Sequence, residues 1–192
     1  MRIGIIGGTF DPPHNGHLYM AEELKKLYKL DKVMFIPAGR PPHKTGRLSA
    51  GSHRYKMLKL AVGSQPYFLV SDIELKKAGK SFTFDTLQLL KKKFGSKTEI
   101  FFMVGADSIL EITTWKNYQE LLKLYKFIVV VRPGYDLSGL DKNIAAKVVI
   151  AKIKGLAISS SDIRERLKEG LPITYFVPEK VEEYIHKHKL YT

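Results

Sequence analysis

Short apolar runs alternate along the chain with segments in which apolar residues recur every three or four positions. The runs are rich in β-branched and aromatic residues, which is typical of β-strands, and they lie at residues 2–6, 32–37, 67–71, 99–104, 127–131 and 147–150. Because these runs are almost entirely apolar, they predict strands that are buried on both faces of a sheet.

The segments between the runs carry apolar stripes that predict amphipathic helices. The stripes are formed by Leu18, Ala21, Leu24 and Leu27; by Thr86, Leu87, Leu90 and Phe94; by Leu121, Leu122 and Leu124; by Ile163 and Leu167; and by Val181 and Ile185. Strands that alternate with helices predict an α/β fold, with a Rossmann-like, doubly wound and mostly parallel sheet flanked by helices on both faces. Two stretches, 39–52 and 132–143, are expected to be long loops that cover a site.

The length of 192 residues suits one domain over 1–192 and leaves little room for a second core. No apolar run approaches the roughly 18 residues of a membrane span, and the N-terminal residues lack the pattern of a signal peptide. The chain has no cysteine, which excludes disulfides, thiolate metal sites and a cysteine nucleophile. We therefore expect a cytoplasmic protein with no membrane partner.

The formal net charge of +13 favours anionic partners, which include nucleic acid, anionic lipid and phosphorylated small molecules. Most of the excess is lysine spread along predicted helices, as in "LKKLYK" and "LLKKKFG", and this distribution is typical of a solvated helix face. The charge therefore selects a class of partner and no more.

The passage "GGTFDPPHNGH" follows the first predicted strand, at the edge where doubly wound sheets bind ligands. Gly7 and Gly8 lack a Cβ and let a ligand approach the backbone. The next helix is expected to start near Gly16, and its N-terminus favours an anion between His14 and His17. Protonated histidine donates from both ring nitrogens, which suits a contact with phosphate.

A nucleotide-binding loop, a zinc site or a structural histidine are other interpretations of this turn. The glycines form neither a G-x-G-x-x-G motif nor a G-x-x-x-x-G-K-[ST] phosphate loop. Two histidines without a third ligand make a poor zinc site, and a structural histidine in the core remains an alternative. The glycine pair and the helix start together favour a phosphate contact.

A second passage, "GLAISSSDIRERL", also runs from a short apolar piece into a helix. Ser159, Ser160 and Ser161 are capping residue types, and a well-capped helix is the simpler interpretation. However, Arg164 lies in the first turn, where the helix dipole disfavours a cation and a bound phosphate would compensate. If both passages lie at one edge of the sheet, they can hold one triphosphate between them.

These residues resemble the nucleotidyltransferase superfamily with the H-x-G-H signature, since residues 14–17 match that signature and 158–164 match its late I-S-S-x-x-I-R element. Five further passages, "PPHK", "SFTFDTL", "GADSILEITTW", "RPGY" and "VPEKVEEYI", resemble the bacterial nicotinate-nucleotide adenylyltransferases. The resemblance spans nearly the whole chain in the family's order. One departure is Phe82, where the family pattern has tyrosine.

The resemblance implies that the 5′-phosphate of nicotinate mononucleotide attacks the α-phosphate of ATP, which yields deamido-NAD and pyrophosphate in NAD biosynthesis. It implies catalytic roles for His14, His17 and Arg164. It implies ATP contacts from Gly7, Gly8, Thr9, Phe10, Gly105, Asp107, Ile158, Ser159 and Ser160, and nicotinate-mononucleotide contacts from Lys44, Thr83, Trp115 and Arg132. Asp107 as a helix cap, Lys44 as a surface lysine and Trp115 as a core residue stay open as alternatives.

ATP chemistry implies Mg²⁺ held mainly by phosphate oxygens and water, so no protein residue is expected to bind metal. Related enzymes that accept nicotinamide mononucleotide or phosphopantetheine are the nearest alternatives. The alternative from another class is a basic nucleic-acid-binding module, which predicts cations and exposed aromatic residues on one face. The cations here are spread over several helices, so no specific nucleic acid is expected. The sequence leaves a homo-oligomer open as well.

Overall fold

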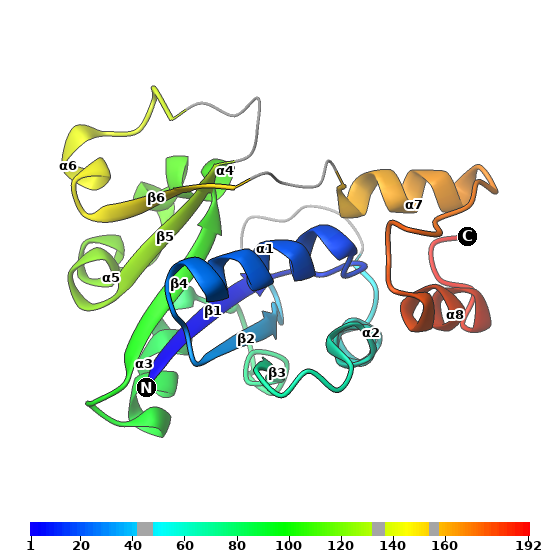
Figure 1. Ribbon diagram of the computed structural model, residues 1–192, viewed down its shortest axis with the longest axis horizontal. Coiled ribbons are helices and arrows are strands. Elements are labelled where there is room, and N and C mark those ends of the chain that lie inside the picture. Colours follow the sequence, from blue (N-terminus) through cyan, green and yellow to red (C-terminus); the bar gives the residue numbers. More distant parts are fainter. Residues whose placement is uncertain (42–47, 132–136, 154–157) are drawn as a thin grey trace.

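The computed structural model describes residues 1–41, 48–131, 137–153 and 158–192, and its centre is a six-stranded sheet (Figure 1). The strands are β1 (Arg2–Gly8), β2 (Lys32–Pro37), β3 (Phe68–Val70), β4 (Glu99–Gly105), β5 (Lys126–Val131) and β6 (Val148–Lys152). They lie in the order β3-β2-β1-β4-β5-β6, and every neighbouring pair is parallel. The predicted doubly wound α/β fold is thus confirmed, with each predicted strand in place.

The described helices are α1 (Asn15–Leu27), α2 (Gly51–Val62), α3 (Thr83–Phe94), α4 (Ala106–Leu110), the 3-10 helix η1 (Ile112–Thr114), α5 (Tyr118–Leu124), α6 (Lys142–Ala145), α7 (Ser160–Lys168) and α8 (Glu179–Lys187). The five predicted helical stripes fall on α1, α3, α5, α7 and α8. The chain thus returns to the sheet through a helix after most strands, as parallel connections require.

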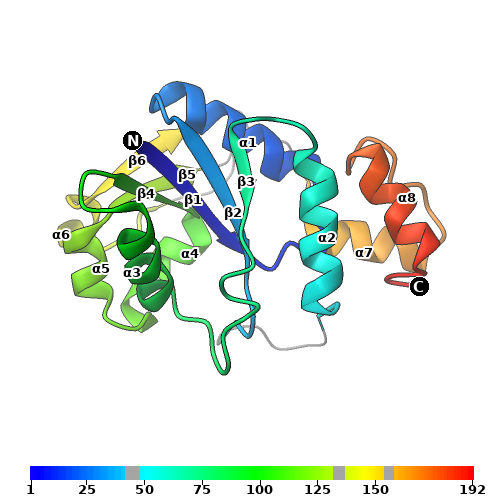
Figure 2. The ribbon, with the colours of Figure 1, turned by 90° about the horizontal axis from the view of Figure 1, so that it is seen from below.

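Side chains alternate along each strand, so both faces of the sheet are apolar and both are covered. On β4, Phe102 and Val104 pack beneath α3, α4, α5 and α6, whereas Phe101 and Met103 face the core under α1 and α2. Figure 2 shows α1 and α3 on opposite sides of the sheet. This burial explains why most strands are apolar throughout rather than on alternate residues. The edge strand β6 differs, because Val149 and Ile150 are 47% and 44% exposed, so the prediction that residues 147–150 are buried on both faces is wrong.

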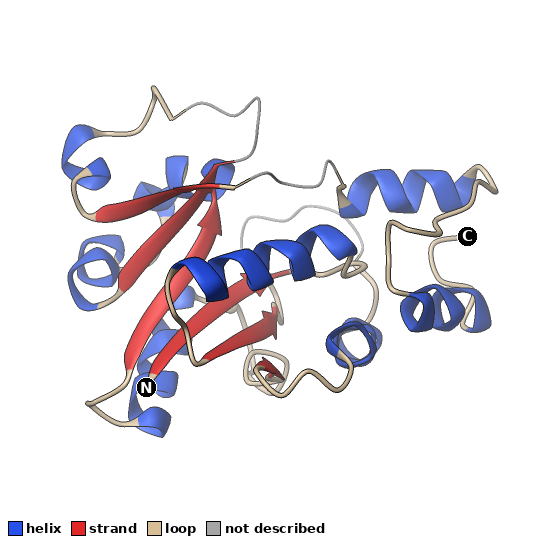
Figure 3. Ribbon diagram, in the orientation of Figure 1, coloured by secondary structure: helices blue, strands red, loops and turns tan. Residues whose placement is uncertain are grey.

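The helices α7 and α8 do not cover the sheet but pack on α2, beyond the edge of the sheet (Figures 1 and 3). Met57 of α2 shares a buried apolar cluster with Ile163 and Leu167 of α7 and with Val181 and Ile185 of α8. The C-terminal part of the chain is therefore attached to the rest through α2. The expectation of one domain over 1–192 stays a prediction.

Two kinds of detail in the predicted elements differ from the structure. Leu27 and Leu124, placed on apolar stripes, are 59% and 57% exposed because they lie in the last turns of α1 and α5, where the helices reach solvent. The predicted loops at 39–52 and 132–143 end inside helices, since α2 begins at Gly51 and α6 at Lys142. Their segments 42–47 and 132–136 lie outside the described residues.

The helix α3 provides a direct test of its packing against the sheet. Leu87 is fully buried, whereas Leu89 on the same helix is 45% exposed. We expect Leu87→Ala to lower the free energy of unfolding by about 2–5 kcal/mol, because it removes buried methyl groups and leaves a cavity. Urea denaturation followed by circular dichroism measures the change. The matched variant Leu89→Ala should cost less than about 1 kcal/mol, and equal losses would contradict this packing.

Candidate functional site

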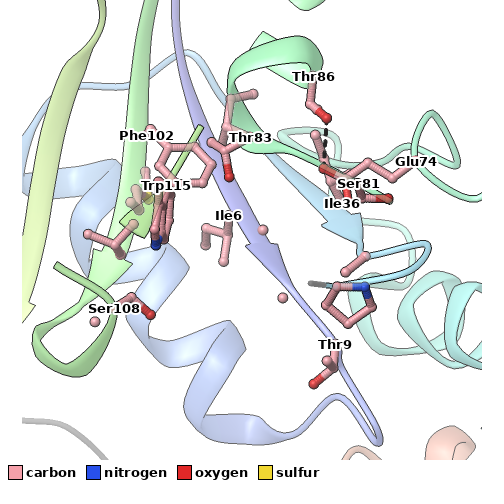
Figure 4. A pocket seen from close by; sticks show the side chains of 18 of the residues that line it. Ile6, Thr9, Ile36, Glu74, Ser81, Thr83, Thr86, Phe102, Ser108 and Trp115 are labelled. Atoms are coloured by element: carbon pink, nitrogen blue, oxygen red, sulfur yellow. Dashed lines mark hydrogen bonds between the residues drawn. The ribbon is translucent and has the colours of Figure 1, made fainter. Parts of the chain in front are cut away.

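A cavity of about 370 Å³ opens at the carboxyl ends of β1 and β4, beside the turn that leads into α1. The strand order reverses between β1 and β4, which is where ligands bind in doubly wound sheets. Figure 4 shows part of its lining. The predicted site residues that line it are Gly7, Gly8, Thr9, Phe10, His17, Thr83, Gly105, Asp107 and Trp115.

The two histidines of the turn lie together, but they have different environments. His14 is the N-cap residue of α1 and is only 2% exposed, whereas His17 lines the cavity. Their rings stack with centroids 3.6 Å apart, and the backbone N–H of His14 donates to His17 Nδ1 at 3.2 Å. Because Nδ1 accepts this bond, the neutral His17 ring carries its proton on Nε2. His17 is thus the histidine presented to a ligand, with His14 behind it.

Gly16 is the residue that allows this stacking. A Cβ at Gly16 would lie 3.0 Å from Nδ1 and 3.1 Å from Cε1 of His14, so any larger residue would press on the buried ring. The same Cβ would lie 3.7 Å from Cβ of Ile158, which places Ile158 against the start of α1. The glycine between the two histidines therefore serves a close approach.

The serine-rich passage reaches the same turn from the other side. Ser159 is the N-cap of α7, and its hydroxyl oxygen accepts the backbone N–H of Asp162 at 3.1 Å, as the capping interpretation predicted. The hydroxyl of Ser160 donates to the carbonyl oxygen of Pro12 at 2.8 Å. Arg164 Nη1 donates to the carbonyl oxygen of Asp11 at 2.7 Å. The structure thus brings the two passages together at one edge of the sheet.

The far end of the cavity combines an aromatic side chain with a helix N-terminus. Trp115 is partly buried, and it meets Phe102 edge-on with ring centroids 6.1 Å apart while it also lines the cavity. Thr83 is the first residue of α3, whose N-cap is Phe82, a residue without a hydrogen-bonding side chain. The first-turn N–H groups of α3 therefore favour an anionic group of a ligand.

Asp107 lies in the first turn of α4 and is exposed at the cavity. Its carboxylate folds over Gly105, since a Cβ on that glycine would lie 2.5 Å from Asp107 Oδ1. The N-cap of α4 is Gly105 itself, so the alternative of Asp107 as the N-cap does not hold. Lys44 and Arg132 lie outside the described residues.

Sequence reasoning missed several polar residues around the site. Glu74 lines the cavity and accepts a hydrogen bond from the hydroxyl of Thr86 at 2.8 Å, and burial raises the pKa of its carboxyl group (Figure 4). Asp11 and Arg54 are each 2% exposed behind the turn. Glu74 lies in the passage "ELKK", which has the pattern of a solvated surface, so only the fold identifies it.

Asp85 connects the two walls at the aromatic end. Its Oδ2 accepts from Lys77 at 2.7 Å and its Oδ1 from Lys116 at 2.8 Å, and Lys116 follows Trp115 directly. The hydrogen bonds from Lys116 and Lys77 lower the pKa of Asp85 below its usual range. The ion pair with Lys116 therefore ties the segment of Trp115 to α3.

The described residues contain no group of three or more histidine, aspartate or glutamate side chains placed to hold a metal ion. None of their helices is long and apolar enough to cross a membrane.

Comparison with known proteins gives consistent results. The model of the cytidylyltransferase-like family matches residues 5–166. A probable nicotinate-nucleotide adenylyltransferase of Thermoanaerobacter sp. (strain X514) is 47% identical, with 100% of this chain and 94% of the relative covered. One from Moorella thermoacetica is 43% identical, with 99% and 91% covered. The structure of Plasmodium falciparum nicotinic acid mononucleotide adenylyltransferase complexed with NaAD matches with a TM-score of 0.82, 23% identity and coverage of 99% and 97%.

The ion pair of Asp85 is open to a spectroscopic test, because Trp115 is the only tryptophan of the chain. We expect Asp85→Asn to shift the fluorescence of Trp115 to longer wavelength and to increase its quenching by acrylamide. Since the pKa of Asp85 is lowered in the folded protein, the ion pair should persist as the pH falls to about 4, the ordinary aspartate range, and be lost only below it. Glu99→Gln, which removes the partner of Lys126 on β4, is the control. If the fluorescence of the wild type shifted with a midpoint above pH 5, or if Glu99→Gln gave the same shift as Asp85→Asn, the ion pair would not hold the segment of Trp115.

Proposed function

Because the chain belongs to the cytidylyltransferase-like family, we propose that it is an enzyme that transfers the adenylyl group of ATP to nicotinate mononucleotide. The products are deamido-NAD and pyrophosphate, and the reaction belongs to NAD biosynthesis. Relatives named as nicotinate-nucleotide adenylyltransferases at 47% and 43% identity over nearly the whole chain support this acceptor. The observation that carries the proposal is one continuous cavity, with the histidine turn at one end and Thr83 and Trp115 at the other.

The phosphate end of the cavity suits the triphosphate of ATP. His17 donates from Nε2 to the α-phosphate, and the stacked ring and backbone N–H of His14 hold it in orientation. Ser159, Ser160 and Arg164 lie at the same turn, and we assign the remaining phosphates to them. Because the Ser160 hydroxyl donates to Pro12, the donors to phosphate are the Ser159 hydroxyl, the Ser160 backbone N–H and the Arg164 guanidinium. The N-termini of α1 and α7 add positive potential toward the anion.

The transfer itself follows from this arrangement. A 5′-phosphate oxygen of nicotinate mononucleotide attacks the α-phosphorus of ATP, and the bond from that phosphorus to the bridging oxygen of pyrophosphate breaks. The phosphate dianion is already a nucleophile, so no side chain needs to remove a proton. Charge that develops on the oxygens of the α-phosphate is stabilised by His17, with Arg164 and His14 in support. Catalysis is then a matter of position and charge.

The adenosine of ATP is assigned to the cavity wall formed by β1 and β4. The backbone of Gly7, Gly8 and Thr9 carries no bulky side chain at the closest approach to the nucleotide, and Phe10 packs behind it. Gly105 and the exposed carboxylate of Asp107 lie at the end of β4, where a carboxylate can accept hydrogen bonds from ribose hydroxyls. Ile158 lies against the start of α1, outside the residues that line the cavity, and is proposed as a further contact of ATP.

Nicotinate is assigned to the aromatic end. The face of Trp115 stacks on the pyridine ring, and Thr83 with the N-terminus of α3 binds the carboxylate. Lys44 and Arg132 are proposed as further contacts of the nicotinate mononucleotide.

The proposal extends to Mg²⁺, which would neutralise phosphate charge when bound. The carboxylate of the turn, Asp11, is buried and accepts hydrogen bonds from Ser49 and Tyr191, and the described residues contain no group of three or more potential metal ligands. The metal would therefore be held mainly by phosphate oxygens of ATP and by water. No protein ligand is therefore assigned. We place the reaction in the cytoplasm, where ATP and mononucleotides meet.

The first test is the reaction. Purified protein with ATP, Mg²⁺ and nicotinate mononucleotide should release pyrophosphate in step with dinucleotide formation. The acceptor arm compares nicotinate mononucleotide with its amide and with phosphopantetheine. We expect preference for the nicotinate form, because the N-terminus of α3 favours a carboxylate over a neutral amide. Faster turnover with the amide or with phosphopantetheine would show that nicotinate mononucleotide is not the preferred acceptor. If no pyrophosphate were released above background, the proposed activity would be wrong.

The second test concerns His17. We expect His17→Ala to lower kcat by roughly a hundredfold or more, on the scale of losing one donor that stabilises transition-state charge. His186→Ala on α8 is the matched control, since that histidine is exposed and lies on α8 rather than at the cavity. Steady-state kinetics and thermal unfolding of both variants separate catalysis from stability. Unchanged turnover in His17→Ala would reject its assigned role.

A further inference from the structure

A buried polar cluster lies behind the turn between β1 and α1 (residues 9–14, the phosphate turn), outside the residues that line the cavity. Asp11 Oδ2 accepts the backbone N–H of Ser49 at 3.0 Å, and Asp11 Oδ1 accepts the hydroxyl of Tyr191 at 2.5 Å. Arg54 donates from Nε to the carbonyl oxygen of Ser49 at 3.0 Å and from Nη1 to that of Thr9 at 2.9 Å. One carboxylate and one guanidinium thus join the turn, the start of α2 and the C-terminal end of the chain.

Tyr191 is held in this cluster against its backbone preference. Its φ of 69° lies in the left-handed region, which costs energy for any residue with a Cβ. A residue next to the C-terminus could relax this conformation by local rotation; the hydrogen bond to Asp11 and packing against the C-terminal apolar cluster hold it in place. Burial and the bond to Asp11 raise the pKa of Tyr191 far above its usual value, so the hydroxyl stays a proton donor at physiological pH.

Two more left-handed residues lie at the same interface. Phe10, with a φ of 50°, precedes Asp11 and packs edge-on against His17 with ring centroids 4.9 Å apart. Tyr175, with a φ of 72°, offers its carbonyl oxygen to the side-chain N–H of Asn15 at 2.8 Å. Such outliers concentrate where surrounding structure dictates the backbone. Three of the six described non-glycine residues with a positive φ, namely Phe10, Tyr175 and Tyr191, lie where the C-terminal segment meets the turn that carries the histidines.

We propose that Tyr191 is a positioning residue for adenylyl transfer, whose hydroxyl acts through Asp11 to set the turn of His17 against the Arg164 side chain of α7. The inference rests on the proposed function. Arg164 donates to the carbonyl oxygen of Asp11, so a shift of Asp11 moves the backbone that joins the two phosphate contacts. Displacement of reacting groups by a fraction of an ångström lowers the rate of a transfer that depends on position.

Docking of the C-terminal helices is separable from this contact. They pack on α2 through an apolar cluster, and Tyr184 of α8 forms a hydrogen bond of 2.9 Å with Nδ1 of His53 on α2. Tyr184 and Tyr191 thus each bond a partner outside the C-terminal segment through one phenolic hydroxyl, but only Tyr191 bonds to the turn. Tyr184→Phe is therefore a matched control for Tyr191→Phe.

The experiment first measures the thermal midpoint of the two variants. It then measures kcat and both KM values at a temperature well below those midpoints. Tyr191→Phe should lower kcat about tenfold, change the KM for nicotinate mononucleotide less than about threefold, and remain folded. Tyr184→Phe should keep kcat within about twofold of wild type. A kcat of Tyr191→Phe within twofold of wild type, or an equal loss in both variants, would overturn the proposal.

A second readout does not need the reaction. The ring resonances of His17, observed by NMR in the full-length protein, should shift in Tyr191→Phe and stay in place in Tyr184→Phe. If wild-type protein released no pyrophosphate, the proposed function would fail while these spectra still tested the mechanical link. If the wild type is active but His17 is unmoved in Tyr191→Phe, the positioning role is wrong and the activity stands.

Discussion

The turn between β1 and α1 has no regular secondary structure, and its backbone carbonyl groups are satisfied by side chains from distant parts of the chain. Arg54 bonds the carbonyl oxygen of Thr9, Arg164 that of Asp11 and Ser160 that of Pro12. Buried backbone groups require such partners, so the turn has a fixed shape only when α2 and α7 are in place. The shape of the turn is therefore a property of the whole fold, although residues 9–14 are consecutive in sequence.

This dependence explains the position of α7 and α8. They contribute no layer to the sheet, and their apolar cluster with α2 lies outside it. Their polar contacts nevertheless converge on the turn, through Ser160 and Arg164 of α7 and through Tyr191 after α8. In the proposed function, the sheet supplies the turn that binds phosphate and the wall that binds adenosine, and the C-terminal helices supply the second set of phosphate contacts. A ligand held between them links two parts of the molecule that α2 already joins.

The sequence allowed prediction where a signal is local. Strands buried on both faces show as apolar runs, and the turn that we propose to bind phosphate shows as glycines and histidines before a helix. Trp115 and Thr83 became candidates only through the family resemblance, because stacking and backbone N–H contacts leave little trace in sequence. Arg54 lies on the buried face of α2 with Met57 and Leu58. Because a charged residue interrupts the apolar stripe, the apolar spacing does not predict this helix. The bond between Asp11 and Tyr191 spans 180 positions and has no local signal.

The chemistry of the proposed reaction explains why so many contacts fix the position of the turn and of His17. Attack by a phosphate dianion on ATP needs neither a covalent nucleophile nor a base, so the protein can accelerate it only by aligning the reactants and stabilising charge. A histidine that moved freely would lose conformational entropy each time it bound the substrate, and this loss would raise the barrier in each turnover. His17 instead stacks on the buried ring of His14, packs against Phe10 and accepts a backbone N–H at Nδ1, which leaves one orientation of its donor. The left-handed backbone of Phe10 and the buried charges behind it cost stability, and that cost is consistent with a site that must be rigid before the substrates arrive.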